Sequence, residues 1–485
     1  MNKKRAWSLL PAALFFAALF VFGPSLSGPF LNWDDNIYIT GSWAVQNLSW
    51  AAVKDAFGGI QFTDYAPLNT LGLSLQYKLW GPWPAGFRFT NLILHVLNAS
   101  LVFAILSRLL GRRPLAAAGA FFFLLHPAQV EVVAWISQHK TLLSAALMFA
   151  AMLSHLDRRP RALVVALAIS SMLVKPQAVI LPLMLVLIDV LDGRKRLLPA
   201  AIDQAALFLF AAATAAANVL TQGSRGAVSS MHGGFFSHAW GVLQLPGRYA
   251  AKILAPYDLC PLYAIDHEAV GSVFFAALTV ILIALLVLAL KSGRRLAALG
   301  LFFFFAALLP VLNVVPMVIW MADRYLYVPL LGALLAAGAI FPNSLFGWRR
   351  AAAVAAAVLA SVILGASTLA QSRIWASDTA LWSETWRLAP GVVAGTNLAS
   401  ALTADGRIED ALPYADWVVA IAPSRPRGWA NRGEIRRRAG LFRGAAEDFS
   451  MAVRLDPLNE SYRAVLSHCL GRLGDLKDAP GKGLR

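Results

Sequence analysis

The feature that most constrains the fold is a series of long apolar runs separated by short basic clusters. The hydrocarbon core of a membrane needs about 20 apolar residues for each helix that crosses it, and runs near that length recur along the first three quarters of the chain. Of the 485 residues, 58% are hydrophobic and 14% are charged, whereas soluble domains carry about 25% charged residues. The pattern predicts an all-α, polytopic membrane domain.

Eleven of these runs are the predicted membrane spans. They are residues 6–22, 87–110, 114–126, 141–155, 162–174, 178–191, 197–220, 272–290, 296–314, 325–340 and 351–370. The short basic clusters, such as DRRPR, DGRKR and KSGRR, then fall on one side, which the positive-inside rule identifies as the cytoplasmic side. The N-terminus is therefore expected inside and the C-terminus outside. A cleaved signal peptide is the alternative reading of the first run.

The stretch 243–255 is apolar but contains Arg248 and Lys252. A span at this place would invert every later segment and scatter the basic clusters over both sides. We therefore interpret it as an interfacial helix on the outer side of the membrane.

Charge and cysteine content exclude several classes of protein. The net charge of +16 is of a size seen in nucleic-acid-binding proteins, but here the basic residues lie between apolar runs, which argues for topology instead. Cys260 and Cys469 are too far apart in the sequence to indicate a disulfide framework or a metal site. The chain has no glycine-rich phosphate loop, Walker motif, HExxH or GxSxG, which argues against an ATP-driven pump.

The composition changes after the predicted membrane domain, residues 1–373. Residues 374–485 are polar, contain no predicted span, and show self-similarity with a period of 34. This period is typical of tetratricopeptide repeats, in which small residues allow two helices to cross closely. We predict a tetratricopeptide domain on the outer side, with an unrelated helical hairpin as the alternative. The matching positions are Asn397 and Asn431, Gly406 and Gly440, Ala411 and Ala445, and Pro423 and Pro457.

Two adjacent carboxylates follow the first predicted span. Asp34 and Asp35 lie in NWDDNIYI, on the outer side of the predicted membrane. A positioned carboxylate can act as a general base, and the alternative role is a helix or turn cap. The same outer loop contains DYAPLNTL, with Tyr65.

A second polar segment, HPAQVEVVAWISQHK, joins the third and fourth predicted spans on the same side. It carries His126 and Glu131, and Glu131 shares a helical stripe with Trp135 and Gln138. The alternative is that His126 caps a helix or lies at the membrane interface. Polar groups near a membrane interior are usually paired or functional, so Glu131 is a candidate site residue.

Four cations lie on the predicted outer face, against the general trend of basic residues. Lys175 ends the fifth span, Arg324 begins the tenth in MADRYLYVP, and Arg248 and Lys252 lie on the interfacial helix. A lipid phosphate is the anion that such cations are expected to hold. The alternatives are snorkelling of Lys175 and an interfacial anchor formed by Arg324 with Asp323.

Several of these stretches together resemble a known family. NWDDNIYI, YAPLNTL, FRFTNLILHVLNASLVFAIL, LHPAQVEVVAWISQHKTLLS, KPQAVILPLMLVLID and MADRYLYVPLLG, followed by the repeats, look like the transmembrane-and-tetratricopeptide O-mannosyltransferase-like proteins. These belong to the type C glycosyltransferase superfamily and are related to the protein O-mannosyltransferases. Ala66 stands where the family often has a polar or basic residue, and the repeat region is shorter than in eukaryotic members.

The resemblance implies an enzyme that takes a sugar, mannose or a similar one, from a polyprenyl-phosphate carrier on the outer face. The acceptor is a hydroxyl, often of Ser or Thr in a protein, and the expected location is a bacterial inner membrane with the repeats in the periplasm. The acidic pair matches the catalytic motif of the family. Asp34 corresponds to the catalytic acidic residue of the protein mannosyltransferases.

A one-step, inverting transfer fits these residues. Asp34 or Asp35 is the expected base, and Lys175, Arg248 and Arg324 are expected to stabilise the departing phosphate. A divalent cation held by the carboxylates is the one cofactor left open. The substrate site is further expected to include Tyr65, His126 and Glu131.

Two other functions remain open on the sequence alone. One is a non-enzymatic membrane scaffold that recruits partners through its repeats, and the other is a lipid-linked glycan polymerase or ligase. A scaffold should tolerate loss of the acidic pair, whereas either enzyme should not.

Overall fold

The computed structural model describes residues 7–58, 65–224, 234–263, 270–342 and 346–478. Within these ranges the regular structure is helical throughout and contains no strand. The chain divides into two compact units, Met1–Ala376 and Ser377–Arg485. The predicted domain boundary, between residues 373 and 374, lies close to this division.

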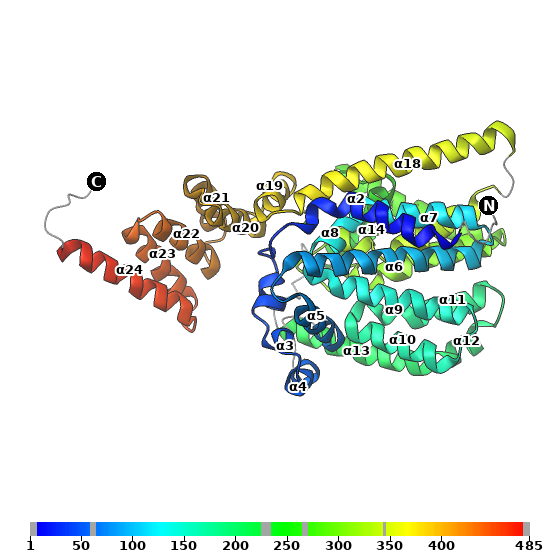
Figure 1. Ribbon diagram of the computed structural model, residues 1–485, viewed down its shortest axis with the longest axis horizontal. Coiled ribbons are helices and arrows are strands. Elements are labelled where there is room, and N and C mark those ends of the chain that lie inside the picture. The colour runs from blue at the N-terminus through cyan, green and yellow to red at the C-terminus, as the bar shows by residue number, and fades with distance from the viewer. Residues whose placement is uncertain (1–6, 59–64, 225–233, 264–269, 343–345, 479–485) are drawn as a thin grey trace. The chain divides into compact units, whose positions relative to one another are not determined.

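The first unit is a bundle of helices whose positions follow the apolar runs of the sequence (Figure 1). The helix α6 (Pro84–Leu110) packs against α2, α7 and α9. The principal helices are α2 (Leu10–Leu26), α7 (Arg113–Leu125), α9 (His139–Leu156), α10 (Arg161–Val174), α11 (Leu181–Leu191), α12 (Leu197–Asp203), α13 (Ala205–Ser224), α15 (Val270–Lys291), α16 (Arg295–Leu308), α17 (Pro329–Ile340) and α18 (Gly347–Ile374).

Length and composition make three helices of the described residues candidates to cross a membrane. These are α6, α15 and α18. Two bent pairs raise the number to five: α7 continues into Pro127–Ala134 after a bend of 53°, and α12 continues into α13 after a bend of 64°. Several shorter apolar helices of this unit have 10–17 residues. The structure thus has three to five candidate spans, and the count of eleven with its orientation stays a prediction.

The pair α16 and α17 shows how close two of these helices approach. A Cβ atom on Gly300 would lie 2.3 Å from the backbone nitrogen of Ala336, and one on Gly332 would lie 2.4 Å from that of Phe304. The backbones therefore pack directly against each other, which is how small residues promote helix association in membranes.

The long connection between the first two predicted spans folds into short helices. They are η1 (Asn36–Thr40), α3 (Trp43–Gln46), α4 (Trp50–Gly58) and α5 (Pro67–Trp80). Ser42 caps α3 by accepting from the backbone nitrogen of Val45. Tyr38, Leu73, Phe87 and Ile136 share one buried cluster. This cluster joins the segment after the acidic pair to the second polar segment.

The predicted interfacial helix forms part of a longer one. The helix α14 spans Gly234–Leu254, contains Pro246 and packs against α15. It is not among the candidate spans of the described residues.

The second unit is a series of antiparallel helices in which each contacts the next. They are α19 (Asp378–Leu388), α20 (Val392–Ala404), α21 (Ile408–Ile421), α22 (Pro426–Arg438), α23 (Phe442–Leu455) and α24 (Glu460–Asp478). Gly406 and Gly440, one period apart, both adopt positive φ, 79° and 76°, in the turns between helices. Gly433 leaves room for the ring of Phe449. These hairpins agree with the period of the sequence, and their identification as tetratricopeptide repeats stays a prediction.

Candidate functional site

The second polar segment forms a broken, fully buried connection between α7 and α9. It consists of η2 (Pro127–Gln129), α8 (Val130–Ala134) and η3 (Ile136–Gln138). Pro127 cannot continue α7, because its ring blocks the helical hydrogen bond. All residues from 123 to 142 are buried, and buried polar groups need partners.

His126 uses both ring nitrogens in holding this connection. Its Nδ1 accepts from the backbone nitrogen of Ala128 at 3.3 Å, so Nε2 carries the proton and donates to the carbonyl of Ile253 at 3.2 Å. The histidine therefore caps η2 and ties it to α14. This arrangement corresponds to the capping alternative and leaves no ring nitrogen for a substrate.

Asp35 anchors the acidic loop to the same connection. Its side chain is fully buried. One carboxylate oxygen accepts from the backbone nitrogen of Leu31 at 3.0 Å. The other accepts from the backbone nitrogen and the hydroxyl of Ser137, at 3.0 and 2.5 Å. Burial raises the pKa of Asp35 above its ordinary value, while these donors and the charge of Arg88 oppose the rise.

Asp34 differs from its neighbour in being only half-buried. Its carbonyl accepts from the backbone nitrogens of Ile37 and Tyr38 and thereby starts η1. Trp33, the residue before it, packs edge-on against Trp135 with 5.4 Å between the ring centroids. The acidic loop thus lies directly against the second polar segment.

Glu131 and Arg324 form a buried ion pair. One oxygen of Glu131 accepts from the backbone nitrogen of Arg324 at 2.8 Å, and the other pairs with its Nη1. The side chains are 1% and 7% exposed. The guanidinium carbon also lies 5.6 Å from the ring of Trp135, which places one indole between Arg324 and Trp33.

Lys175 reaches the same region from the end of α10. Its Nζ donates to the hydroxyl of Thr141 at 2.6 Å, and that hydroxyl donates to Gln138, also at 2.6 Å. Gln138 follows Ser137, the partner of Asp35. The second polar segment therefore connects the acidic pair, Arg324 and Lys175 through direct contacts.

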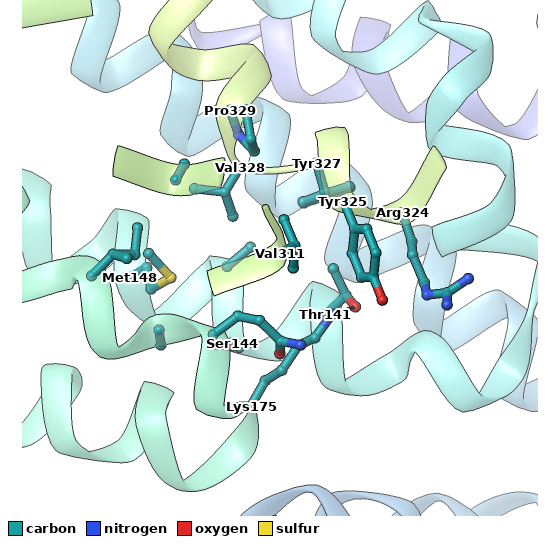
Figure 2. A pocket seen from close by; sticks show the side chains of 15 residues that line it. Thr141, Ser144, Met148, Lys175, Val311, Arg324, Tyr325, Tyr327, Val328 and Pro329 are labelled. Carbon is teal, nitrogen blue, oxygen red and sulfur yellow. Dashed lines mark hydrogen bonds between the residues drawn. The ribbon is translucent and has the colours of Figure 1, made fainter. Parts of the chain in front are cut away.

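Lys175 and Arg324 line one small cavity (Figure 2). Its volume is about 40 Å³. In Figure 2 the guanidinium of Arg324 is directed away from Met148 and Val311, and Tyr325 lies beside it. The cavity is thus lined by two cations, Lys175 and Arg324, together with apolar side chains such as Met148 and Val311.

A larger apolar pocket adjoins this cavity. Its volume is about 350 Å³, and its lining includes Leu309, Val314 and Met317. Gln177, Ile180, Val311 and Tyr325 line both spaces. The two therefore form neighbouring compartments, one with cations and one with an apolar wall.

Six of the eight predicted site residues do not line this cavity, and Arg248 and Tyr65 are the two of these whose contacts have not been described above. The guanidinium of Arg248 donates to Gln244 and lies 4.4 Å from the ring of Phe275. The hydroxyl of Tyr65 donates to the carbonyl of Phe57, and its backbone nitrogen donates to Asn218, which lines the larger pocket. Their predicted contacts with substrate stay predictions.

Sequence reasoning missed Arg88, Ser137 and Thr141. Arg88 is fully buried in α6 and donates to the carbonyls of Gly28, Pro29 and Ala134, so it fixes the start of the acidic loop. A charged residue within an apolar run was the available signal for it. Ser137 and Thr141 carry no such signal, because their partners are distant in the sequence.

The described residues contain no group of three or more His, Cys, Asp or Glu side chains placed to hold a metal ion. Both oxygens of Asp35 already accept from N–H and O–H donors. Asp35 therefore fits a bound divalent cation poorly.

Comparison with known proteins gives one informative similarity. No family model matches the sequence. Over 166 residues, 32% of the chain, it is 30% identical to the protein O-mannosyl-transferase Tmtc1 of Drosophila melanogaster. The chain spans about a fifth of that relative, 19% of its length. The similarity therefore supports the family resemblance over about a third of this chain.

Proposed function

We propose that the protein is an integral-membrane glycosyltransferase that moves a sugar from a polyprenyl phosphate to an acceptor hydroxyl. The partial similarity to an O-mannosyl-transferase supports the class of reaction. The observation that carries the proposal is the placement of Lys175 and Arg324 at a small cavity that continues into an apolar pocket. A lipid-linked phosphate needs both environments side by side.

The cations hold the donor phosphate in this proposal. Glu131 fixes the position of Arg324 through the backbone nitrogen and Nη1, and the remaining guanidinium donors are directed to the phosphate. Lys175 supplies a second positive charge in the lining of the same cavity. Preorganised cations in a water-poor site stabilise a developing phosphate charge more than they would in water. The apolar pocket takes the first part of the isoprenoid chain.

Asp34 is the proposed base. The acceptor oxygen attacks the anomeric carbon of the sugar, and the bond from that carbon to the phosphate oxygen breaks. The hydroxyl proton passes to Asp34, and polyprenyl phosphate leaves as the anion. A single displacement of this kind inverts the configuration at the sugar carbon. Asp35 keeps the loop in place, because both of its oxygens are used within the fold.

The site belongs to the outer face in this proposal, with a protein Ser or Thr or a glycan as the acceptor. The identity of the acceptor distinguishes a protein glycosyltransferase from a glycan polymerase or ligase. A scaffold has no need of the buried Glu131–Arg324 pair or of the cations beside an apolar pocket.

Sugar transfer by the purified protein tests the proposal. Polyprenyl-phosphate mannose is the donor, and peptides and membrane glycans are offered as acceptors. Arg324→Lys should lose most of the transfer rate while the protein stays folded, because an ammonium cannot reproduce the fork geometry of a guanidinium. Arg108→Lys is the matched control, since Arg108 is 61% exposed and pairs with Asp157.

Three results would contradict the proposal. They are transfer at the wild-type rate by Arg324→Lys, equal loss in Arg108→Lys, and no transfer by the wild-type protein to any hydroxyl acceptor. The last result, together with full biological function of an Asp34→Asn variant, would favour the scaffold.

A further inference from the structure

A second polar hollow lies at the other end of the first unit and has no part in the proposed reaction. Its volume is about 390 Å³, far more than the ~30 Å³ of one water molecule. Five basic side chains line it: Arg158, Arg159, Arg161, Arg194 and Lys195. Asp189 and Asp203 are the two carboxylates in the lining, so positive charge dominates.

Helix geometry separates this hollow from the Lys175–Arg324 cavity. Arg161 starts α10, and Lys175 follows the end of that helix. The neighbouring α9 has 18 residues, from His139 to Leu156, and is therefore about 27 Å long. Thr141 and Lys175 line the cavity, whereas His155 and Arg161 line the hollow, so the two spaces lie at opposite ends of these helices.

The carboxylates pair with only some of the basic side chains that line the hollow. Lys195 pairs with Asp203, and Arg161 donates to the carbonyl of the same residue. The side chains of Arg158 and Arg159 are exposed and have no partner within the described residues. Two guanidinium groups therefore remain available to an anion that enters the hollow.

Asp189 gives the hollow a fixed floor. Its side chain is 3% exposed, and one oxygen pairs with His155 at 2.9 Å. The other has no hydrogen bond from the described residues and lies 3.6 Å from Lys195. This buried carboxylate orients His155 and Lys195 at the base of the hollow. The hollow thus combines exposed guanidinium groups at its edge with a buried, paired carboxylate at its base, as expected of a binding site.

We propose that this hollow binds the phosphate of an anionic phospholipid headgroup. The hollow opens between the ends of apolar helices, where a headgroup lies when its chains follow the helix surfaces. Basic pockets between membrane helices bind such headgroups. Arg158 and Arg159 contact the phosphate, and the hollow holds the polar remainder of the headgroup. The proposal does not depend on the sugar-transfer reaction.

Thermal unfolding of the purified full-length protein in a nonionic detergent tests this site. The probes are a short-chain phosphatidylglycerol, the matching phosphatidylcholine, inorganic phosphate and glycerol phosphate. A ligand that binds the folded state raises the melting temperature, and the rise grows with the ratio of its free concentration to its dissociation constant. Phosphatidylglycerol should stabilise the wild type at concentrations where the other three probes do not.

Two variants locate the effect. Each basic side chain near an anionic lipid contributes about a fivefold factor in affinity. Arg158→Gln with Arg159→Gln should therefore weaken phosphatidylglycerol binding about 25-fold. Val165→Phe should block binding by filling the hollow without changing its charge, because Val165 belongs to the lining. Arg349→Gln with Arg350→Gln is the matched control, since this pair lies outside the hollow.

Several outcomes would overturn the proposal. Undiminished binding by the double variant, or equal loss in the Arg349 and Arg350 control, would show that the effect is not local. Stabilisation by inorganic phosphate or glycerol phosphate equal to that by phosphatidylglycerol would assign the hollow to a soluble phosphate compound. Equal stabilisation by phosphatidylcholine would make the effect one of detergent replacement.

Discussion

The buried pair of Glu131 and Arg324 permits a quantitative prediction of stability. Glu131→Gln removes the negative charge and replaces one of two acceptor oxygens with a donor amide. The single remaining oxygen can accept from the backbone nitrogen of Arg324 or from its Nη1, which in the wild type donate to two separate oxygens. One donor is therefore left facing an amide N–H in a site where both side chains are less than a tenth exposed.

The expected loss follows from burial. Removing one partner of a buried ion pair costs about 3 to 5 kcal/mol, because the other charge stays buried without compensation. Since glutamine keeps one acceptor, the loss should lie near the lower end, at about 3 kcal/mol. Replacing both partners with neutral side chains, as in Glu131→Gln with Arg324→Met, should recover most of this loss.

The assay is reversible unfolding in mixed micelles, followed by tryptophan fluorescence. Asp157→Asn is the control, because its partner Arg108 is 61% exposed and such surface pairs contribute only about 0.2 to 1 kcal/mol. A loss below about 1 kcal/mol for Glu131→Gln would refute the reasoning. A double variant no more stable than the single one would refute it as well.

Three further predictions follow from the same contacts. Asp34→Asn should lower turnover about 10²- to 10⁴-fold with donor binding retained. Asp35→Asn should instead lower the melting temperature, because the carboxylate of Asp35 joins Leu31 to Ser137. Turnover and melting temperature of both variants check this prediction, and reversed effects would contradict it. In the second unit, Gly440→Ala should lower the free energy of unfolding by about 1 kcal/mol, because the φ of Gly440 is 76°. Pulse proteolysis of the full chain measures this, and unchanged resistance to cleavage would disprove it. The hydrogen bond from Arg437 lowers the pKa of Glu434 below 4.5, so the ion pair stabilises the fold above that pH and its contribution is lost as the pH falls below it. Glu434→Gln should remove this part of the pH dependence of unfolding. An unaltered pH profile would count against the ion pair.

The sequence predicted helix positions well because hydrophobic runs are local signals. The run 141–155 corresponds to α9, His139–Leu156, and the run 162–174 to α10, Arg161–Val174. Gly406 and Gly440, which the period of 34 matched with each other, lie in equivalent turns. Each of these inferences needs only the residues inside one window of the chain.

Tertiary partners could not be predicted in the same way. Asp35 and Ser137 are 102 residues apart, and Glu131 and Arg324 are 193 apart. Periodicity indicates which face of a helix is polar, but not which distant face it meets. The contact between the guanidinium of Arg248 and the ring of Phe275 is a further example of a partner that periodicity does not indicate.

Helix breaks, two of them at prolines, explain how polar side chains are placed at the Lys175–Arg324 cavity and around it. Proline follows His126 and Lys175 directly, and the residue before a proline is driven out of the helical conformation. Both residues are extended, with ψ of 123° and 122°, and each ends one helix and precedes a short 3₁₀ helix.

Arg324 likewise lies in a short 3₁₀ helix, η6 (Asp323–Leu326), after extended backbone at Ala322. Broken helices free backbone donors, and within an apolar bundle those donors must find partners in the protein. Glu131 accepts from one such donor, the backbone nitrogen of Arg324. The breaks therefore do two things at once: they turn polar side chains inward, and they create the hydrogen-bonding need that a buried carboxylate satisfies. A site assembled in this way depends on interruptions of the apolar pattern, so the interruptions carry the functional information that the apolar runs themselves lack.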